Sequence, residues 1–108
     1  MTDYLALLWV HWLSDFVCQT DQMAINKSKS NEWLTVHVIV YTAPFFWWGW
    51  QFAVINGLAH WCTDWVTSRI NAWNWKRGKI HYFFVGVGLD QVLHYTVLFY
   101  TAKWLGVF

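Results

Sequence analysis

The sequence has little charge. Of its 108 residues, 12% are Asp, Glu, Lys or Arg, whereas a soluble domain carries about 25% charged residues. This is too little charge to cover a surface that faces water. Hydrophobic residues make up 57% of the chain, and they include eleven tryptophans, a residue type that favours bilayer interfaces. The composition predicts an integral membrane protein whose first partner is the lipid bilayer. The net charge of +1 argues against nucleic-acid binding, which needs many cationic side chains on phosphates.

Cysteine and proline are also scarce. Cys18 and Cys62 form no Cys-x-x-Cys pair, and we expect both to be reduced and to act as small apolar residues. The single proline, Pro44, lacks a backbone donor and is expected to kink or end its helix. No basic residues precede the first apolar run and no small-residue cleavage site follows it, so we expect this segment to be retained.

Apolar segments separated by polar links predict an all-α fold, an integral membrane four-helix bundle that forms a single domain over residues 1–108. The expected helices cover residues 4–18, 33–50, 51–71 and 80–104. The first is short, because about 20 residues are needed to cross a bilayer core. Residues 19–32 are expected to form a polar connection, in which Asn31 is the N-cap of the second helix.

The basic residues predict an orientation. Two links, one between the first and second helices and one between the third and fourth, hold six of the seven Lys and Arg residues: Lys27, Lys29, Arg69, Lys76, Arg77 and Lys79. By the positive-inside rule, both links face the cytoplasm, and the protein is a multi-pass membrane protein with both termini on the outer side.

Ionisable residues recur in the apolar segments. A motif His-Trp-x-(Ser/Thr)-Asp occurs at residues 11–15 and again at 60–64, and in a helix its His and Asp lie on one face. Asp90 and His94 have the same spacing in reverse order, and His37 lies in the remaining segment. The repeat indicates two helix-hairpin repeats, which would bring the motifs face to face.

These residue types suit a metal. A carboxylate in hydrocarbon costs from about 3 to more than 10 kcal/mol, so intramembrane Asp and His residues usually have a role. Imidazole and carboxylate together bind Zn, Mn or Fe. We expect a divalent-metal site with the ligands His11, Asp15, His60, Asp64, Asp90 and His94. His37, as a ligand or general base, and Asp64 are the expected catalytic residues.

Three functions remain open at this level. A metal-activated water predicts an intramembrane hydrolase that acts on a lipid-linked or membrane-proximal substrate. Alternatively, the His/Asp pairs are structural, and the protein is a non-enzymatic subunit of a larger membrane assembly. The third interpretation is a small proton or ion pathway through the same groups. The aromatic surface is also compatible with a homo-oligomer.

Ordered short motifs over most of the chain resemble an uncharacterised family of small bacterial and phage-encoded inner-membrane proteins, a domain of unknown function. The motifs are His11-x3-Asp15-Phe16-x2-Gln19-Thr20, Met23-Ala24, Asn26-Lys27, His37, His60-x3-Asp64 and Asp90-Gln91-x2-His94. The transmembrane His-x3-Asp motifs are also similar to those of predicted membrane-bound metal-dependent hydrolases. The resemblance implies a bacterial inner-membrane location and adds Gln19 and Lys27 to the site residues, but it implies no established reaction.

Overall fold

The computed structural model describes residues 3–107, and these residues form helices joined by short turns, which confirms the expected all-α class. The elements are α1 (Asp3–Trp12), the π-helical turn η1 (Leu13–Val17), α2 (Asp21–Asn26), α3 (Asn31–Thr42), the 3₁₀ segment η2 (Ala43–Trp48), α4 (Trp50–Lys76) and α5 (Ile80–Trp104). The last helix has the predicted bounds, whereas α4 continues beyond its predicted end at residue 71.

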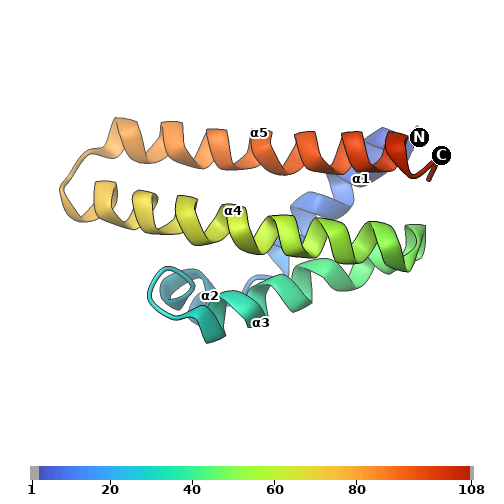
Figure 1. The fold of residues 1–108 in the computed structure, drawn as a ribbon. Helices are drawn as coiled ribbons and strands as arrows, with labels where there is room; N and C mark the ends of the chain where they lie inside the picture. Colours follow the sequence, from blue (N-terminus) through green and yellow to red (C-terminus); the bar gives the residue numbers. More distant parts are fainter. Residues whose placement is uncertain (1–2, 108) are drawn as a thin grey trace.

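Helices α4 and α5 form a long antiparallel pair, with α3 packed against α4 and α1 against α5 (Figure 1). The start of α1 and the end of α5 lie at the same end of the bundle as the turn between α3 and α4 (Figure 1). The segment around α2 and the turn between α4 and α5 lie at the opposite end (Figure 1). The two basic links therefore share one end of the molecule, as the charge pattern predicted.

The first copy of the repeated motif does not lie on a regular α-helix. After Trp12 the backbone widens into η1, which is closed by a bond from the Cys18 N–H to the Leu13 carbonyl at 2.8 Å. Turns of this kind are rare and frequently occur at functional sites. Ser14 and Asp15, the buried residues of η1, lie on the turn, so the local distortion sets where the Asp15 carboxylate points.

The link between the first and second predicted helices contains a helix that the sequence analysis did not expect. Thr20 caps α2 by accepting from the Met23 N–H at 3.2 Å, and Met23 is buried. The predicted cap at Asn31 is wrong, because Ser30 has the extended cap conformation and accepts from the Trp33 N–H at 3.4 Å. Asn31 instead accepts at its side chain from Trp65 and Arg69 of α4, which ties α3 to α4.

Pro44 ends the α-helical part of α3, as predicted. It lies at the start of η2, where a missing backbone donor is tolerated, and the chain then reverses at Gly49. Gly49 has a φ of 123°, a conformation that side-chain-bearing residues rarely adopt, and α4 begins at the next residue.

The bundle interior has an apolar half and a polar half. Apolar side chains fill the half near the chain ends: Leu7, Tyr41, Phe45, Phe52, Ala53, Leu98 and Ala102. Gly57 lets α4 approach α3 closely, because a Cβ at this position would lie 2.5 Å from Thr42 Oγ1. The other half of the interior holds the buried His and Asp residues described below.

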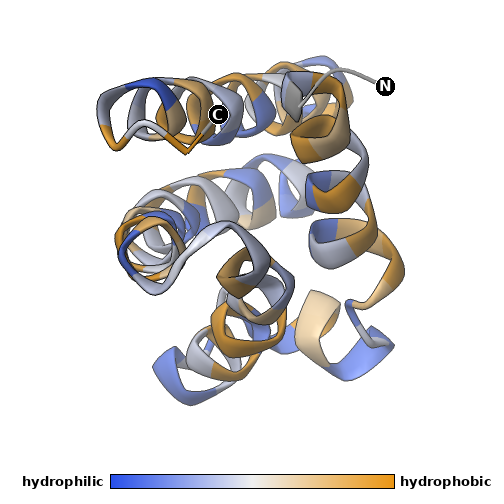
Figure 2. Cartoon of the chain, turned by 90° about the vertical axis from the view of Figure 1, so that its right-hand side faces the viewer, coloured by the Kyte–Doolittle hydropathy of each residue, from blue (hydrophilic) through white to orange (hydrophobic). Residues whose placement is uncertain are grey.

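The outside of the bundle is rich in large apolar side chains. Only α5 is long and apolar enough to span a membrane among the described helices, and 17% of its most apolar stretch is buried. Trp47 is 87% exposed and Trp104 is 78% exposed. Figure 2 shows hydrophobic residues, in orange, recurring along the helices.

Candidate metal centre

Six buried His and Asp side chains from four segments meet in the middle of the bundle. Asp15 comes from η1, His37 from α3, His60 and Asp64 from α4, and Asp90 and His94 from α5: each is at most 8% exposed. The i,i+4 spacing puts both residues of each pair on the inner face of its helix, while packing of the helices brings the pairs together. Six of the seven predicted site residues therefore form one cluster, and His11 lies beside it.

Four ligand atoms in this cluster lie within 4.8 Å of one another. His37 Nε2 lies 3.0 Å from Asp15 Oδ1 and 3.2 Å from Asp64 Oδ2. His60 Nε2 lies 3.5 Å and 3.1 Å from the same two oxygens, and the two nitrogens are 3.2 Å apart. Ligands about 2.0 to 2.1 Å from a tetrahedral zinc ion are separated by about 3.3 Å, so these four atoms have the spacing of a tetrahedral metal site.

Two further properties fit a cation. Asp64 Oδ2 is buried and lacks a partner with hydrogen-bond geometry, although the two imidazole nitrogens lie close to it. Among the described residues, the one lysine ion pair with Asp15, Asp64 or Asp90 is that of Lys27 with Asp64, so three ionised carboxylates would leave two negative charges in a buried site. Buried charge of this size needs compensation, which a divalent cation or protonated imidazoles can provide.

A second group of ligand atoms, from Asp15, Asp90 and His94, lies beside the first. His94 Nε2 is 3.2 Å from Asp90 Oδ2 and also 3.2 Å from Asp64 Oδ1. Asp15 therefore belongs to both groups, and the two oxygens of Asp64 face opposite directions, one toward His37 and the other toward His94. Carboxylates placed in this way can bridge neighbouring cations.

His11 lies next to the two groups of ligand atoms, and neither group includes it. Its Nδ1 hydrogen bonds with the Tyr41 hydroxyl at 2.8 Å, and its Nε2 hydrogen bonds with Gln91 Oε1 at 2.7 Å. Since both ring nitrogens have partners, His11 orients its neighbours in this arrangement, including Asp15 at 3.6 Å.

Ring stacking orients the imidazole of His60. It lies between the rings of Tyr41 and His94, with centroids 3.9 Å from each. The Nδ1 atoms of His37 and His60 are buried without hydrogen-bond partners among the described residues. Packing against the neighbouring rings therefore holds the Nε2 of His60 in the cluster.

Two polar residues, Gln91 and Thr67, bind the carboxylates. The Gln91 side-chain amide donates to Asp15 Oδ2 at 3.2 Å and to Asp90 Oδ2 at 3.1 Å, and the Thr67 hydroxyl donates to Asp90 Oδ1. Gln91 thus connects η1 to α5 through the site, and Thr67 connects α4 to α5. Such neighbours fix the direction in which a ligand oxygen points.

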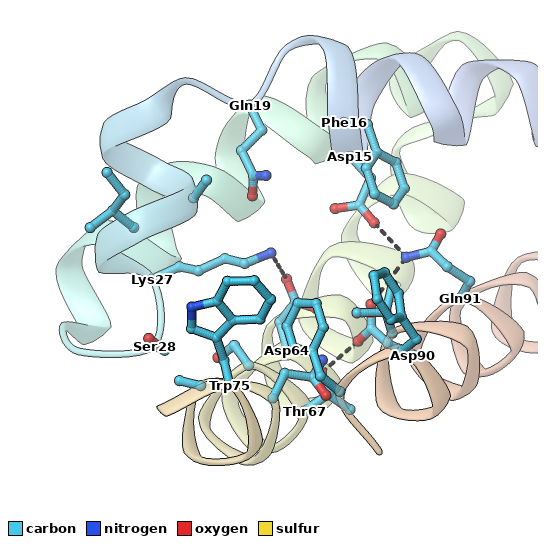
Figure 3. A pocket seen from close by; sticks show the side chains of 18 of the residues that line it. Asp15, Phe16, Gln19, Lys27, Ser28, Asp64, Thr67, Trp75, Asp90 and Gln91 are labelled. Atoms are coloured by element: carbon cyan, nitrogen blue, oxygen red, sulfur yellow. Dashed lines mark hydrogen bonds and ion pairs between the residues drawn. The ribbon is translucent and has the colours of Figure 1, made fainter. Parts of the chain in front are cut away.

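The cluster opens on one side into a cavity of about 730 Å³ (Figure 3). Asp15, Asp64 and Asp90 form its inner wall, while the imidazoles lie behind them. Lys27 reaches across from the end of α2, and its ammonium nitrogen lies 3.6 Å from Asp64 Oδ2 (Figure 3). A small molecule in the cavity could therefore touch the carboxylates and this lysine at once.

Sequence reasoning missed two functional neighbours. The sequence motifs include Gln91 without giving it a role, and Tyr41 is absent from the predicted site. Tyr41 follows His37 by one helical turn, and Gln91 is an amide in an apolar helix beside Asp90; both positions are recognisable signals. The resemblance brought in Lys27, which lies at the cavity, and Gln19, which also lines it.

Buried His and Asp residues from separate helices define the protein as a helical bundle with a candidate metal-binding site. The chain belongs to the family described as "Protein of unknown function (DUF3307)", which matches residues 4–107. Comparison with curated proteins gave no match, and comparison with solved structures gave none either. The family match spans every residue of the cluster without supplying a reaction.

Proposed function

We propose that this protein is a multi-pass protein of the bacterial inner membrane and an intramembrane, divalent-metal-dependent hydrolase acting on a lipid-linked or membrane-proximal substrate. The observation that carries the proposal is the set of four buried ligand atoms next to an open cavity: the two imidazole nitrogens lie 3.0 to 3.5 Å from each other and from the two carboxylate oxygens, and all four atoms lie within 4.8 Å of one another.

The membrane location is supported by the surface. Helix α5 has large apolar residues on its outer side, and α4, with 27 residues, is about 40 Å long, enough to cross a hydrocarbon core of about 30 Å. Both basic links lie at one end of the bundle (Figure 1), which the positive-inside rule assigns to the cytoplasm.

Asp15, His37, His60 and Asp64 would hold the ion, and the donor set of two imidazoles and two carboxylates suits zinc, manganese or iron. Such an ion supplies an activated water near neutral pH and polarises the ester that is attacked. Gln91 and Thr67 keep the carboxylates in place, and Lys27 lies where it can bind an anionic part of the substrate. His37 is thereby assigned as a ligand.

The first test is metal content. Protein purified in mild detergent without chelators should contain Zn, Mn or Fe when measured by elemental mass spectrometry. His60→Ala should lose the metal, because it removes one of four ligands, while His81→Ala, an exposed histidine outside both groups, should keep it. One ion per chain is expected if only the first group binds metal, and two ions are expected if Asp90 and His94 also hold one.

The same preparations test hydrolysis. Metal-loaded wild type and His81→Ala should release product from a lipid-linked ester in vesicles, and His60→Ala should not. Metal-free wild type from chelator-free preparations would contradict the proposal and favour a packing subunit with structural His/Asp pairs.

A further inference from the structure

The cavity beside the metal cluster has two chemically different parts. Its lining includes the three carboxylates of Asp15, Asp64 and Asp90, and it also includes Lys27, Lys29 and Lys76. These lysines come from two segments that are far apart in the sequence. Lys27 and Lys29 follow α2, and Lys76 is the last residue of α4. The fold therefore brings three cationic side chains to one cavity in a chain with a net charge of only +1.

Lys27 is available to a ligand. Its ammonium lies 3.6 Å from Asp64 Oδ2, longer than the roughly 2.8 Å of a tight charge-assisted hydrogen bond, and its side chain is 21% exposed. An ion bound to Asp64 would take over the neutralisation of this carboxylate. The lysine would then have donors free for a phosphate oxygen.

Polar atoms in the cavity wall also lack partners. Ser68 Oγ, Gln19 Oε1 and Asn71 Oδ1 are buried without hydrogen bonds among the described residues, and all three residues line the cavity. Buried polar groups are nearly always paired with protein, water or a ligand. The Ser68 hydroxyl is therefore suited to donate to an ester oxygen of a headgroup, and the Gln19 side-chain oxygen to accept from a hydroxyl.

The remaining wall is apolar and continues to the outer surface. Phe16 of η1 and Phe84 and Val87 of α5 line the cavity, and Phe16 and Phe84 are 43% and 63% exposed. In a membrane, this side faces hydrocarbon. A long apolar chain attached to the headgroup could leave between η1 and α5 without entering water.

We propose, on the basis of the hydrolase function above, that the substrate is an anionic phosphoester carried on a long apolar chain. Its phosphate lies between the metal cluster and Lys27, Lys29 and Lys76, and its chain passes Phe16 and Phe84 into the bilayer. Hydrolysis of this class of ester forms a bond from the water oxygen to phosphorus and breaks the phosphorus–oxygen bond to the alcohol, which leaves with a proton.

The test is binding of three probes to the full chain in detergent, measured by native mass spectrometry. Dioleoyl phosphatidic acid contains both parts of the proposed ligand, dioleoylglycerol lacks the phosphate, and glycerol 3-phosphate lacks the chains. We expect phosphatidic acid to bind about tenfold more tightly than either of the other probes. It alone has both a phosphate for the lysines and acyl chains for the apolar wall. Lys76→Gln and Lys27→Gln should each weaken it severalfold.

Lys103→Gln is the matched control, because Lys103 is an exposed lysine near the opposite end of the bundle and does not line the cavity. The assignment is overturned if glycerol 3-phosphate binds as tightly as the lipid, if dioleoylglycerol does, or if Lys103→Gln weakens binding as much as Lys76→Gln. The metal content of the same samples is measured separately, so that the two proposals can fail independently. Metal without phosphate-dependent lipid binding refutes the substrate class alone, whereas lipid binding without metal refutes the hydrolase.

Discussion

The imidazole of His60 is stacked on that of His94, with ring centroids 3.9 Å apart and planes inclined by 14°. This stack joins the two groups of ligand atoms, because His60 belongs to the first and His94 to the second. Two positive rings at this distance would repel each other by about 4 kcal/mol at an effective dielectric constant of ~20.

This repulsion helps to choose between two ways of balancing the buried carboxylates. Protonating both stacked imidazoles would supply positive charge at the cost of that repulsion. A divalent cation supplies the same charge while the rings stay neutral and offer a lone pair to the ion. The stacking therefore favours metal binding over a site that is balanced by protons alone.

Removing the metal should lower stability. An ion present at about 100 times its dissociation constant stabilises the folded state by about 2.7 kcal/mol, since it binds the folded chain and not the unfolded one. Adding a chelator to wild type should therefore lower the thermal unfolding midpoint by several degrees, as followed by circular dichroism in detergent. His60→Ala should show no chelator effect, and an equal shift in wild type and His60→Ala would contradict the assignment of the site.

His11→Gln should weaken metal binding less than loss of a ligand does. His11 contacts Tyr41 and Gln91 with its two ring nitrogens and lies next to Asp15, so it positions the ligand oxygen. Loss of such a neighbour typically lowers metal affinity about 10- to 100-fold. Competition with a fluorescent zinc chelator measures this loss, and a complete loss of metal, equal to that of His60→Ala, would show that His11 is itself a ligand.

Gly57→Ala should destabilise the contact between α3 and α4. The added methyl would meet the Thr42 side chain, with Oγ1 at 2.5 Å and Cγ2 at 3.2 Å, and overpacking of this kind costs about 1 to 3 kcal/mol. Gly88→Ala is the matched control, because a Cβ there has nothing within 4 Å. Chemical unfolding should show the loss in Gly57→Ala, with partial recovery in Gly57→Ala/Thr42→Ala; equal stability of the two alanine variants would refute the close approach.

The sequence predicted those local features that depend only on residues close together in the chain. The end of α3 near Pro44 and the bounds of α5 follow from a missing donor and an uninterrupted apolar run. The cap at Ser30 and the short helix α2 were missed. Asn31 is an equally good cap by residue type, and its side chain is drawn instead to Trp65 and Arg69 of a helix more than 30 residues away.

The sequence by itself determined the helical class and the pairs of His and Asp that share a helix face, because residues four apart always lie one above the other. The succession of helices also determined that the first and third links lie at one end of the bundle, because consecutive antiparallel helices reverse direction at each link. Only the tertiary structure decided which atoms meet. The widened turn η1 aims Asp15 at His37, and packing between Tyr41 and His94 holds His60. The approach of α2 brings Lys27 to Asp64. These contacts join residues far apart in the chain, and no local pattern specifies the helix rotations and separations that create them.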